Sequence, residues 1–107
     1  MSIANTPKPP YYAVIFSSII ENDNEEYSVM AEKMEELAKV QPGFLGFETA
    51  RDSIGISVSY WENVESIKNW RINVDHLEAQ SKGKSEWYSS YKVRIAKVER
   101  DYHFDKL

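Results

Sequence analysis

The side chains best suited to chemistry lie on one stretch that begins at residue 63. At about 100° of rotation per residue, a helix there carries a stripe of uncharged hydrogen-bonding groups, made of Asn69, Asn73, His76 and Gln80. The imidazole of His76 titrates near neutral pH, so His76 is a candidate general base. Asn73 is a candidate donor to a developing oxyanion. An ordinary surface histidine at the edge of a helix explains His76 equally well.

Trp70 lies on the apolar stripe of the same predicted helix. The other members of that stripe are Ile67, Val74 and Leu77. A tryptophan in this position usually anchors a core, but it also forms an aromatic wall if a cleft opens between the helix and a sheet. Asn69, Gln80 and Ser17 complete the candidate substrate-binding residues. Ser17 and Ser18 lack the strand-to-helix turn of a serine nucleophile, so neither is assigned that role.

Composition excludes several kinds of site. The 107 residues contain no cysteine, which rules out disulfides and thiolate chemistry. His76 and His103 do not stand at metal-ligand spacing, so no metal site is predicted. A net charge of −4 without long runs of one sign argues against nucleic acid. No apolar run reaches the length of a membrane span and the N-terminus lacks a signal core, so we expect a cytoplasmic protein without membrane contact.

The remaining elements must position these residues. Residues 1–10 are expected to form an extended proline-rich lead-in, and residues 11–107 a single domain. Apolar patterning predicts strands over residues 11–20, 44–51, 54–61 and 91–102, and helices over residues 25–41 and from residue 63. Pro42-Gly43 ends the first helix and Asn63 caps the second. The apolar phase of the last strand changes near residue 95, either at a β-bulge or because its two halves are covered on opposite faces.

The order strand, helix, strand, strand, helix, strand is that of a ferredoxin-like α+β domain with an antiparallel sheet. On the strand over residues 54–61, one face is small apart from Trp61, so another group can approach it closely. The strand over residues 11–20 is apolar on both faces, but two helices cover only one face of the sheet. We therefore expect a homodimer that packs sheet on sheet.

Four segments carry a resemblance to a known family: QPGFLGFETARD, GISVSYWENVESIKNW, HLEAQSKGKSEWY and YKVRIAKVERDY. The chain resembles the small bacterial members of the antibiotic biosynthesis monooxygenase superfamily of dimeric α/β barrels. The resemblance implies a homodimer with a pocket between sheet and helices in each subunit. It also implies one of two chemistries, which are cofactor-independent oxygenation of phenolic or quinol-like compounds and oxidative haem degradation.

The haem-degrading branch is similar at Trp70 but uses an asparagine on the first strand and a histidine ten residues after the tryptophan. This chain has Ser17 and Ser18 on that strand and Gln80 at the second position. We therefore expect no haem and no other cofactor. The function predicted is oxygenation of a small aromatic, quinol- or polyketide-like molecule, with His76 and Asn73 as catalytic residues and Trp70 as the aromatic wall. The alternative is a non-catalytic dimeric barrel that binds a small ligand or serves a stress response.

Overall fold

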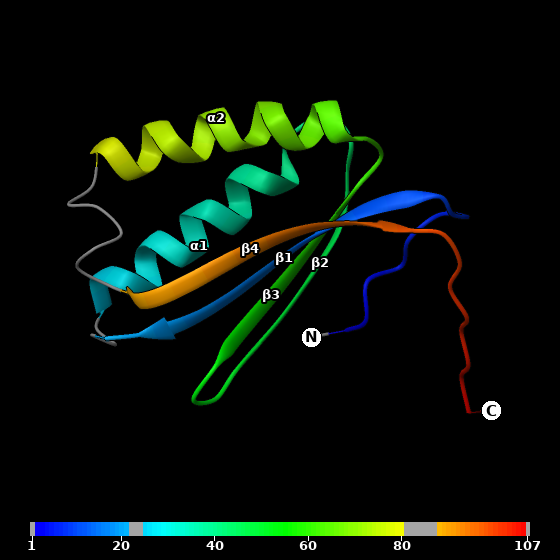
Figure 1. Ribbon diagram of the computed structural model, residues 1–107, viewed down its shortest axis with the longest axis horizontal. Coiled ribbons are helices and arrows are strands. Elements are labelled where there is room, and N and C mark those ends of the chain that lie inside the picture. Colours follow the sequence, from blue (N-terminus) through cyan, green and yellow to red (C-terminus); the bar gives the residue numbers. More distant parts are fainter. Residues whose placement is uncertain (1, 22–24, 81–87, 107) are drawn as a thin grey trace.

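A computed structural model describes residues 2–21, 25–80 and 88–106, with backbone only for residues 25, 26 and 76–80. Its strands and helices follow one another in the predicted order (Figure 1). The elements are β1 (Tyr11–Ile20), α1 (Glu25–Lys39), β2 (Phe44–Arg51), β3 (Gly55–Trp61), α2 (Val64–Gln80) and β4 (Tyr88–Val98). The ferredoxin-like fold is confirmed. The last strand begins and ends earlier than its sequence pattern predicts, and residues 99–106 follow it outside the sheet.

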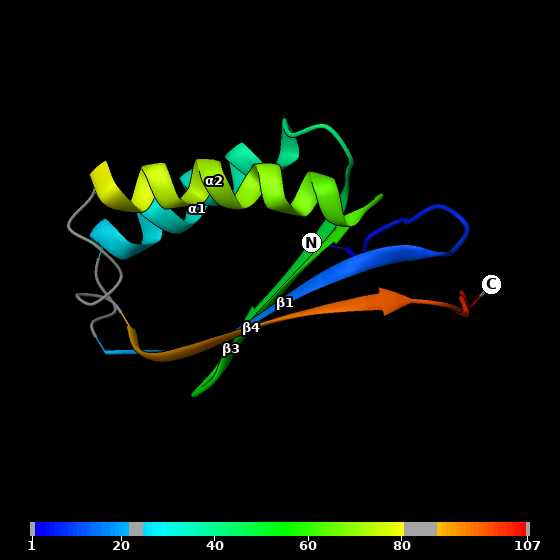
Figure 2. The same cartoon turned by 45° about the horizontal axis from the view of Figure 1, so that its top comes forward.

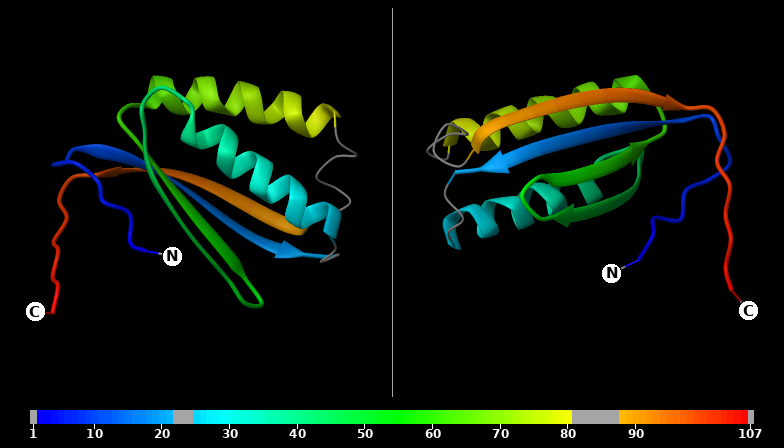
Figure 3. Two further views of the ribbon diagram at one scale, coloured as in Figure 1. Left: turned by 180° about the vertical axis from the view of Figure 1, so that it is seen from behind. Right: turned by 60° about the horizontal axis from the view of Figure 1, so that its bottom comes forward.

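The four strands form one antiparallel sheet in the order β2-β3-β1-β4. Both helices lie over the same face of this sheet (Figure 2). β1 is an inner strand, between β3 and β4, and it carries apolar side chains on both faces. We call the side under the helices the helix face and the other side the open face. Figure 3 shows the open face, with no helix in front of it, in its right-hand view.

The buried core lies at one end of the helix face, where α1 stops and α2 starts. Its members are Val14, Ala38, Trp61 and Ile67, and Trp61 is fully buried. Asn63 caps α2 as predicted, because its side-chain oxygen accepts the backbone N–H of Ser66 at 2.8 Å. Gly43 follows α1 with φ of 86°, a left-handed conformation that favours glycine after a helix.

Part of the open face is covered by the lead-in, residues 2–10. The backbone N–H of Ala4 donates to Glu48 at 2.9 Å, and Tyr60 donates its hydroxyl to the other oxygen of that carboxylate at 2.7 Å. Ala4 crosses directly over Gly46, where a Cβ would meet the Ala4 methyl group at 2.8 Å. Burial and the bond to Glu48 raise the pKa of Tyr60 well above its ordinary value.

Tyr11 joins both terminal segments at the same end of the sheet. Its hydroxyl accepts from Thr6 at 2.9 Å and donates to Asp101 at 2.5 Å. Burial first, and the bond to Asp101 second, raise the pKa of Tyr11. The ring of Tyr11 lies 5.8 Å from that of Tyr60. The open face is therefore closed at this end by the chain itself and bare beyond it.

The change of apolar phase in β4 arises because its two halves carry their apolar side chains on opposite faces of the sheet, and not from a β-bulge. The pairing of β1 with β4 runs without a shift from Tyr11↔Val98 to Ile19↔Ser90, so no bulge lies near residue 95. Val93 and Ile95 stand on the helix face, whereas Ala96 and Val98 stand on the open face, opposite Ala13 and Tyr11. The one irregularity in this pairing falls between Ile19 and Ile20. No helix in the described ranges is long and apolar enough to cross a membrane.

Candidate functional site

Four small polar side chains and one glycine form a floor on the helix face beyond the buried core. The register of the sheet brings together on this face Ser18 of β1, Thr49 of β2, and Gly55, Ser57 and Ser59 of β3. We call these five residues the polar floor. Thr49 and Ser57 share a hydrogen bond of 2.9 Å across the two strands. The small column on β3 is the close-approach face that its sequence predicts, and it turns toward the helices.

Two tryptophans stand at the core end of the polar floor. Trp61 and Trp70 stack with ring centroids 5.1 Å apart and planes inclined by 30°. Trp61 donates its indole N–H to Ser59 at 2.8 Å. The indole Nε1 of Trp70 is buried and has no hydrogen-bond partner in the described part of the chain. A buried donor without a partner costs about 1–3 kcal/mol, so this N–H is suited to an oxygen atom of a bound ligand.

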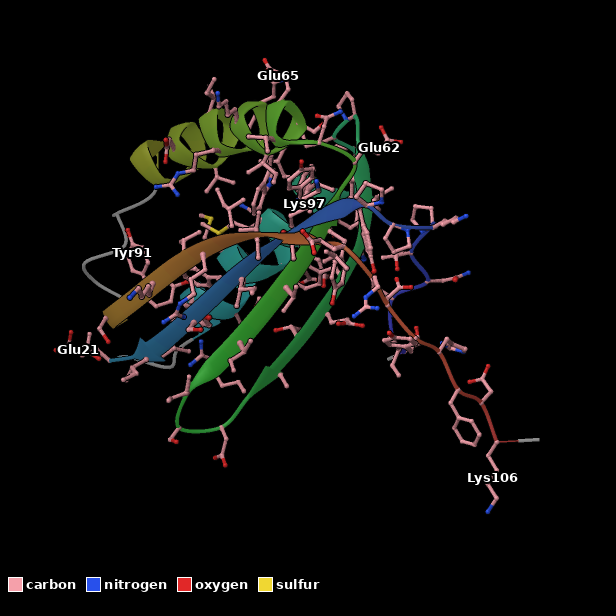
Figure 4. All side chains as sticks on the ribbon, turned by 45° about the vertical axis from the view of Figure 1, so that its right-hand side comes forward. Glu21, Glu62, Glu65, Tyr91, Lys97 and Lys106 are labelled. Atoms are coloured by element: carbon pink, nitrogen blue, oxygen red, sulfur yellow. The ribbon has the colours of Figure 1, made fainter. Side chains whose placement is uncertain are left out.

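Four aromatic rings gather at the other end of the polar floor. We call Phe16, Tyr27, Tyr88 and Tyr91 the aromatic cluster. Phe16 packs against Tyr88 at 5.5 Å and against Tyr91 at 5.4 Å between ring centroids, and Tyr27 meets Tyr88 edge-on at 5.7 Å. Figure 4 shows Tyr91 rising from β4 on the side that carries the helices. Tyr91 is 39% exposed and the other three rings are half-buried, so part of the surface of the cluster is exposed.

Of the predicted stripe on α2, the structure describes the side chains of Asn69 and Asn73, and Asn73 reaches Gln41, just after the end of α1. Asn69 and Asn73 are both exposed. The side-chain amide of Asn73 donates to the Gln41 side-chain oxygen at 3.2 Å and to the backbone oxygen of Asn69 at 3.1 Å. Both of its amide hydrogens therefore have acceptors within the chain. In this arrangement Asn73 ties α2 to the residue that follows α1.

The other predicted site residues separate in space. Ser17 stands on the open face, opposite Ile56 and Lys92, so it cannot line one site with Trp70 inside a subunit. Its neighbour Ser18 is the serine on the helix face, and it is 2% exposed. The side chains of His76 and Gln80 lie outside the described residues. No cluster of three metal-ligating side chains occurs in the part of the chain that the structure describes.

Sequence reasoning missed Arg51, which reaches the polar floor from β2. Arg51 donates to the backbone oxygen of Ser18 at 3.3 Å and also to the Ser18 hydroxyl. Its guanidinium carbon lies 6.0 Å from the ring centroid of Tyr27. The available sequence signal was the position of Arg51 at the end of one predicted strand, four residues before Gly55, the first small residue of the next strand.

Comparison with known proteins bears on both family and fold. No family model matches the chain. The chain is 49% identical over 106 residues to the uncharacterized protein YqjZ of Bacillus subtilis. The alignment covers 97% of this chain and 93% of that protein.

Solved structures match the fold at low sequence identity. A variant of SnoaB, a cofactor-independent oxygenase from Streptomyces nogalater, superposes with a TM-score of 0.71 at 7% identity over 85% of this chain and 95% of that chain. The "putative antibiotic biosynthesis monooxygenase" of Nitrosomonas europaea superposes with a TM-score of 0.66 at 10% identity over 86% of this chain and 92% of that chain.

Proposed function

Because this chain belongs to the family of Bacillus subtilis YqjZ and has the fold of antibiotic biosynthesis monooxygenases, we propose that it is a monooxygenase. The proposed enzyme needs no cofactor and acts on a small aromatic, quinol-like molecule. One observation carries the proposal: the indole N–H of Trp70 is buried at the edge of the polar floor and has no hydrogen-bond partner among the described residues. It is a donor placed where an aromatic ligand between sheet and helices would present an oxygen atom.

The proposed reaction oxidises an activated ring CH₂ or C–H group with molecular oxygen. A base removes one proton, and the resulting anion gives electrons to O₂ and forms a carbon–oxygen bond. The peroxide that results loses water, which leaves a new C=O group and carries away the second oxygen atom with two hydrogens. The negative charge of the anion rests largely on the substrate's ring oxygen. Trp70 stabilises this charge by donating its N–H to that oxygen.

The donor role falls to Trp70 because Asn73 already uses both amide hydrogens on Gln41 and Asn69. His76 remains the proposed base. It stands on α2 six residues after Trp70, on the same helix but on a different stripe. The proton-transfer part of the mechanism therefore has its own test, separate from that of the tryptophan.

Oxygen consumption with a panel of anthrones and quinols tests the proposal. We expect turnover by the wild-type protein without added metal, flavin or haem. Trp70→Phe should lower kcat about a hundredfold, as the loss of one oxyanion donor does, and His76→Ala should lower it by a similar or larger factor. His103→Ala is the matched control, since His103 is exposed and bonded to Asp105 near the C-terminus. Wild-type protein that consumes no oxygen with any compound would overturn the proposal.

The rival function is a dimeric barrel that binds an aromatic ligand without turnover. The occupied amide of Asn73 favours it, because a second preorganised donor is then missing. Tight binding of an anthrone with no oxygen uptake would decide for the binder. Haem should give no sharp Soret band of a histidine-ligated complex. A tight one-to-one haem complex that is lost in His76→Ala would instead establish the haem branch.

We also propose that two copies pair through the bare part of the open face. Apolar side chains stand there on both inner strands, and they are Ile15, Ile19, Ile56 and Val58. Ile19 and Ile56 are exposed in the single chain, whereas the lead-in contacts the face at Tyr11, Gly46 and Glu48. Two-fold pairing would bury this surface without leaving a growing end.

A further inference from the structure

We propose that Arg51 and the aromatic cluster bind the carboxylate group and the rings of a planar aromatic acid. The inference rests on the proposed function in taking the ligand to be aromatic. It adds that the ligand carries a negative charge and that this charge binds at Arg51. Its test measures binding without turnover, so the two proposals can fail independently.

The position of Arg51 is set by one row of the sheet. Arg51 pairs with Gly55, Gly55 pairs with Ser18, and Ser18 pairs with Tyr91, so all four stand side by side on the helix face. The Arg51 side chain runs across Gly55, where a Cβ would overlap its guanidinium, and ends on the oxygens of Ser18. The glycine thus provides the channel in which the arginine lies flat on the sheet.

Arg51 carries a charge for which the described residues supply no counter-ion. Among the described residues no carboxylate forms an ion pair with it, whereas Arg71 on α2 pairs with Asp75 at 3.1 Å. A guanidinium has five N–H donors, and Ser18 accepts from two of its nitrogens. The remaining donors suit a carboxylate, whose two oxygens match the planar fork of the guanidinium.

The surroundings of Arg51 favour an aromatic acid over a small anion. Its guanidinium lies near the ring of Tyr27, and Tyr91 belongs to the same row of the sheet. Trp70 packs against the core cluster that includes Val14, and Val14 is four residues from Ser18 on β1, a span of about 13 Å. A flat ligand of two or three fused rings is long enough to place an oxygen near Trp70 and its carboxylate near Arg51.

Binding of 2-naphthoate and of the neutral 2-naphthamide, measured by calorimetry without oxygen, tests the inference. The wild-type protein should prefer the carboxylate by about tenfold to a hundredfold. Arg51→Gln should abolish that preference and leave binding of the amide unchanged. The matched control is Arg71→Gln, which removes an exposed arginine from α2 and should keep the preference. Equal affinities in the wild type, or no binding of either probe, would overturn the inference.

Gly55→Ala gives a second test that keeps the charge and all side chains of the site. The three atoms nearest to the new methyl group all belong to the guanidinium of the flexible Arg51 side chain, so the fold should persist while the guanidinium is pushed off Ser18. Carboxylate preference should fall about tenfold. Preserved preference in both Arg51→Gln and Gly55→Ala, in folded protein, would refute the role of Arg51. Selective carboxylate binding without oxygen uptake would retain this inference and reject the monooxygenase.

Discussion

Trp61 and Trp70 stack with centroids 5.1 Å apart, yet their indole N–H groups have opposite environments. That of Trp61 is bonded to Ser59 inside the core, and that of Trp70 is buried with no partner in the described residues. The same side-chain type thus stabilises the fold at one position and is left available at the other. We therefore expect Trp61 to contribute mainly to stability and Trp70 mainly to ligand binding.

Trp61→Phe and Trp70→Phe form a matched pair for this separation. Trp61→Phe leaves the buried Ser59 hydroxyl without its donor and opens space in the core, so unfolding free energy should fall by about 1–3 kcal/mol. Trp70→Phe removes an unpartnered donor and should change it by less than about 1 kcal/mol. Urea denaturation measures both. An equal loss in the two variants would contradict the assignment of Trp70 to a site.

The two tyrosines on the open face predict a loss of stability in alkali. The pKa values of Tyr11 and Tyr60 are raised above the ordinary value of 10.0, so the folded chain holds these protons more tightly than the unfolded chain does. Their contribution is complete below about pH 10 and is lost as the pH rises through the folded-state pKa values. Tyr60→Phe should flatten this decline, measured by denaturation between pH 8 and 11.5 (roughly the range around the tyrosine pKa). Tyr102→Phe, on an exposed residue, should leave it unchanged.

The dimer prediction can be tested by charges on opposite faces of β1 and β3. Ile56→Asp lies on the open face and should give a folded monomer of 12.4 kDa, whereas the wild type should sediment near twice that mass. Val14→Asp places the charge in the core and should prevent folding. Ile72→Asp is the control, because Ile72 on α2 is 57% exposed, against 47% for Ile56. A wild-type monomer in sedimentation would remove the basis for pairing.

The cap of α2 should contribute measurably to stability. Asn63→Ala removes the oxygen that accepts the Ser66 backbone N–H and should cost about 1 kcal/mol of unfolding free energy. Asn63→Ser retains an acceptor and should cost less. Asn69→Ala, in the middle of the same helix, separates capping from a general loss of asparagine. A cost for Asn69→Ala as large as that for Asn63→Ala would argue against the cap.

The sequence predicts the elements of this fold well because local chemistry determines them. Asn63 caps the helix that follows it, and Pro42-Gly43 follows the end of α1, through interactions within a few residues. The face that the helices cover is a different matter. Because β1 is apolar on both faces, its pattern does not say whether Ser17 or Ser18 points under the helices. The structure selects Ser18.

The site that the structure adds depends on contacts that no local pattern contains. Arg51 pairs with Gly55, four residues further along the β2–β3 hairpin, but Ser18 joins this row only through the register of β1 with β3, which brings together segments more than thirty residues apart. Asn73 shows the reverse case. Its spacing on α2 is read correctly from the sequence, but its partner Gln41 comes from outside the helix and occupies the amide.

The placement of the buried core has a mechanical consequence for the helix layer. Ala38, near the end of α1, is 1% exposed, whereas Tyr27, Met30 and Met34 toward its start are only half-buried. α1 is therefore tightly packed on the sheet near its end and more loosely packed near its start. Amide hydrogen exchange should accordingly quicken along α1 from Ala38 toward Tyr27, and uniform protection would contradict this. Such a gradient would allow a ligand to reach the polar floor by a small tilt of α1 about its buried end, while Trp61 stays packed.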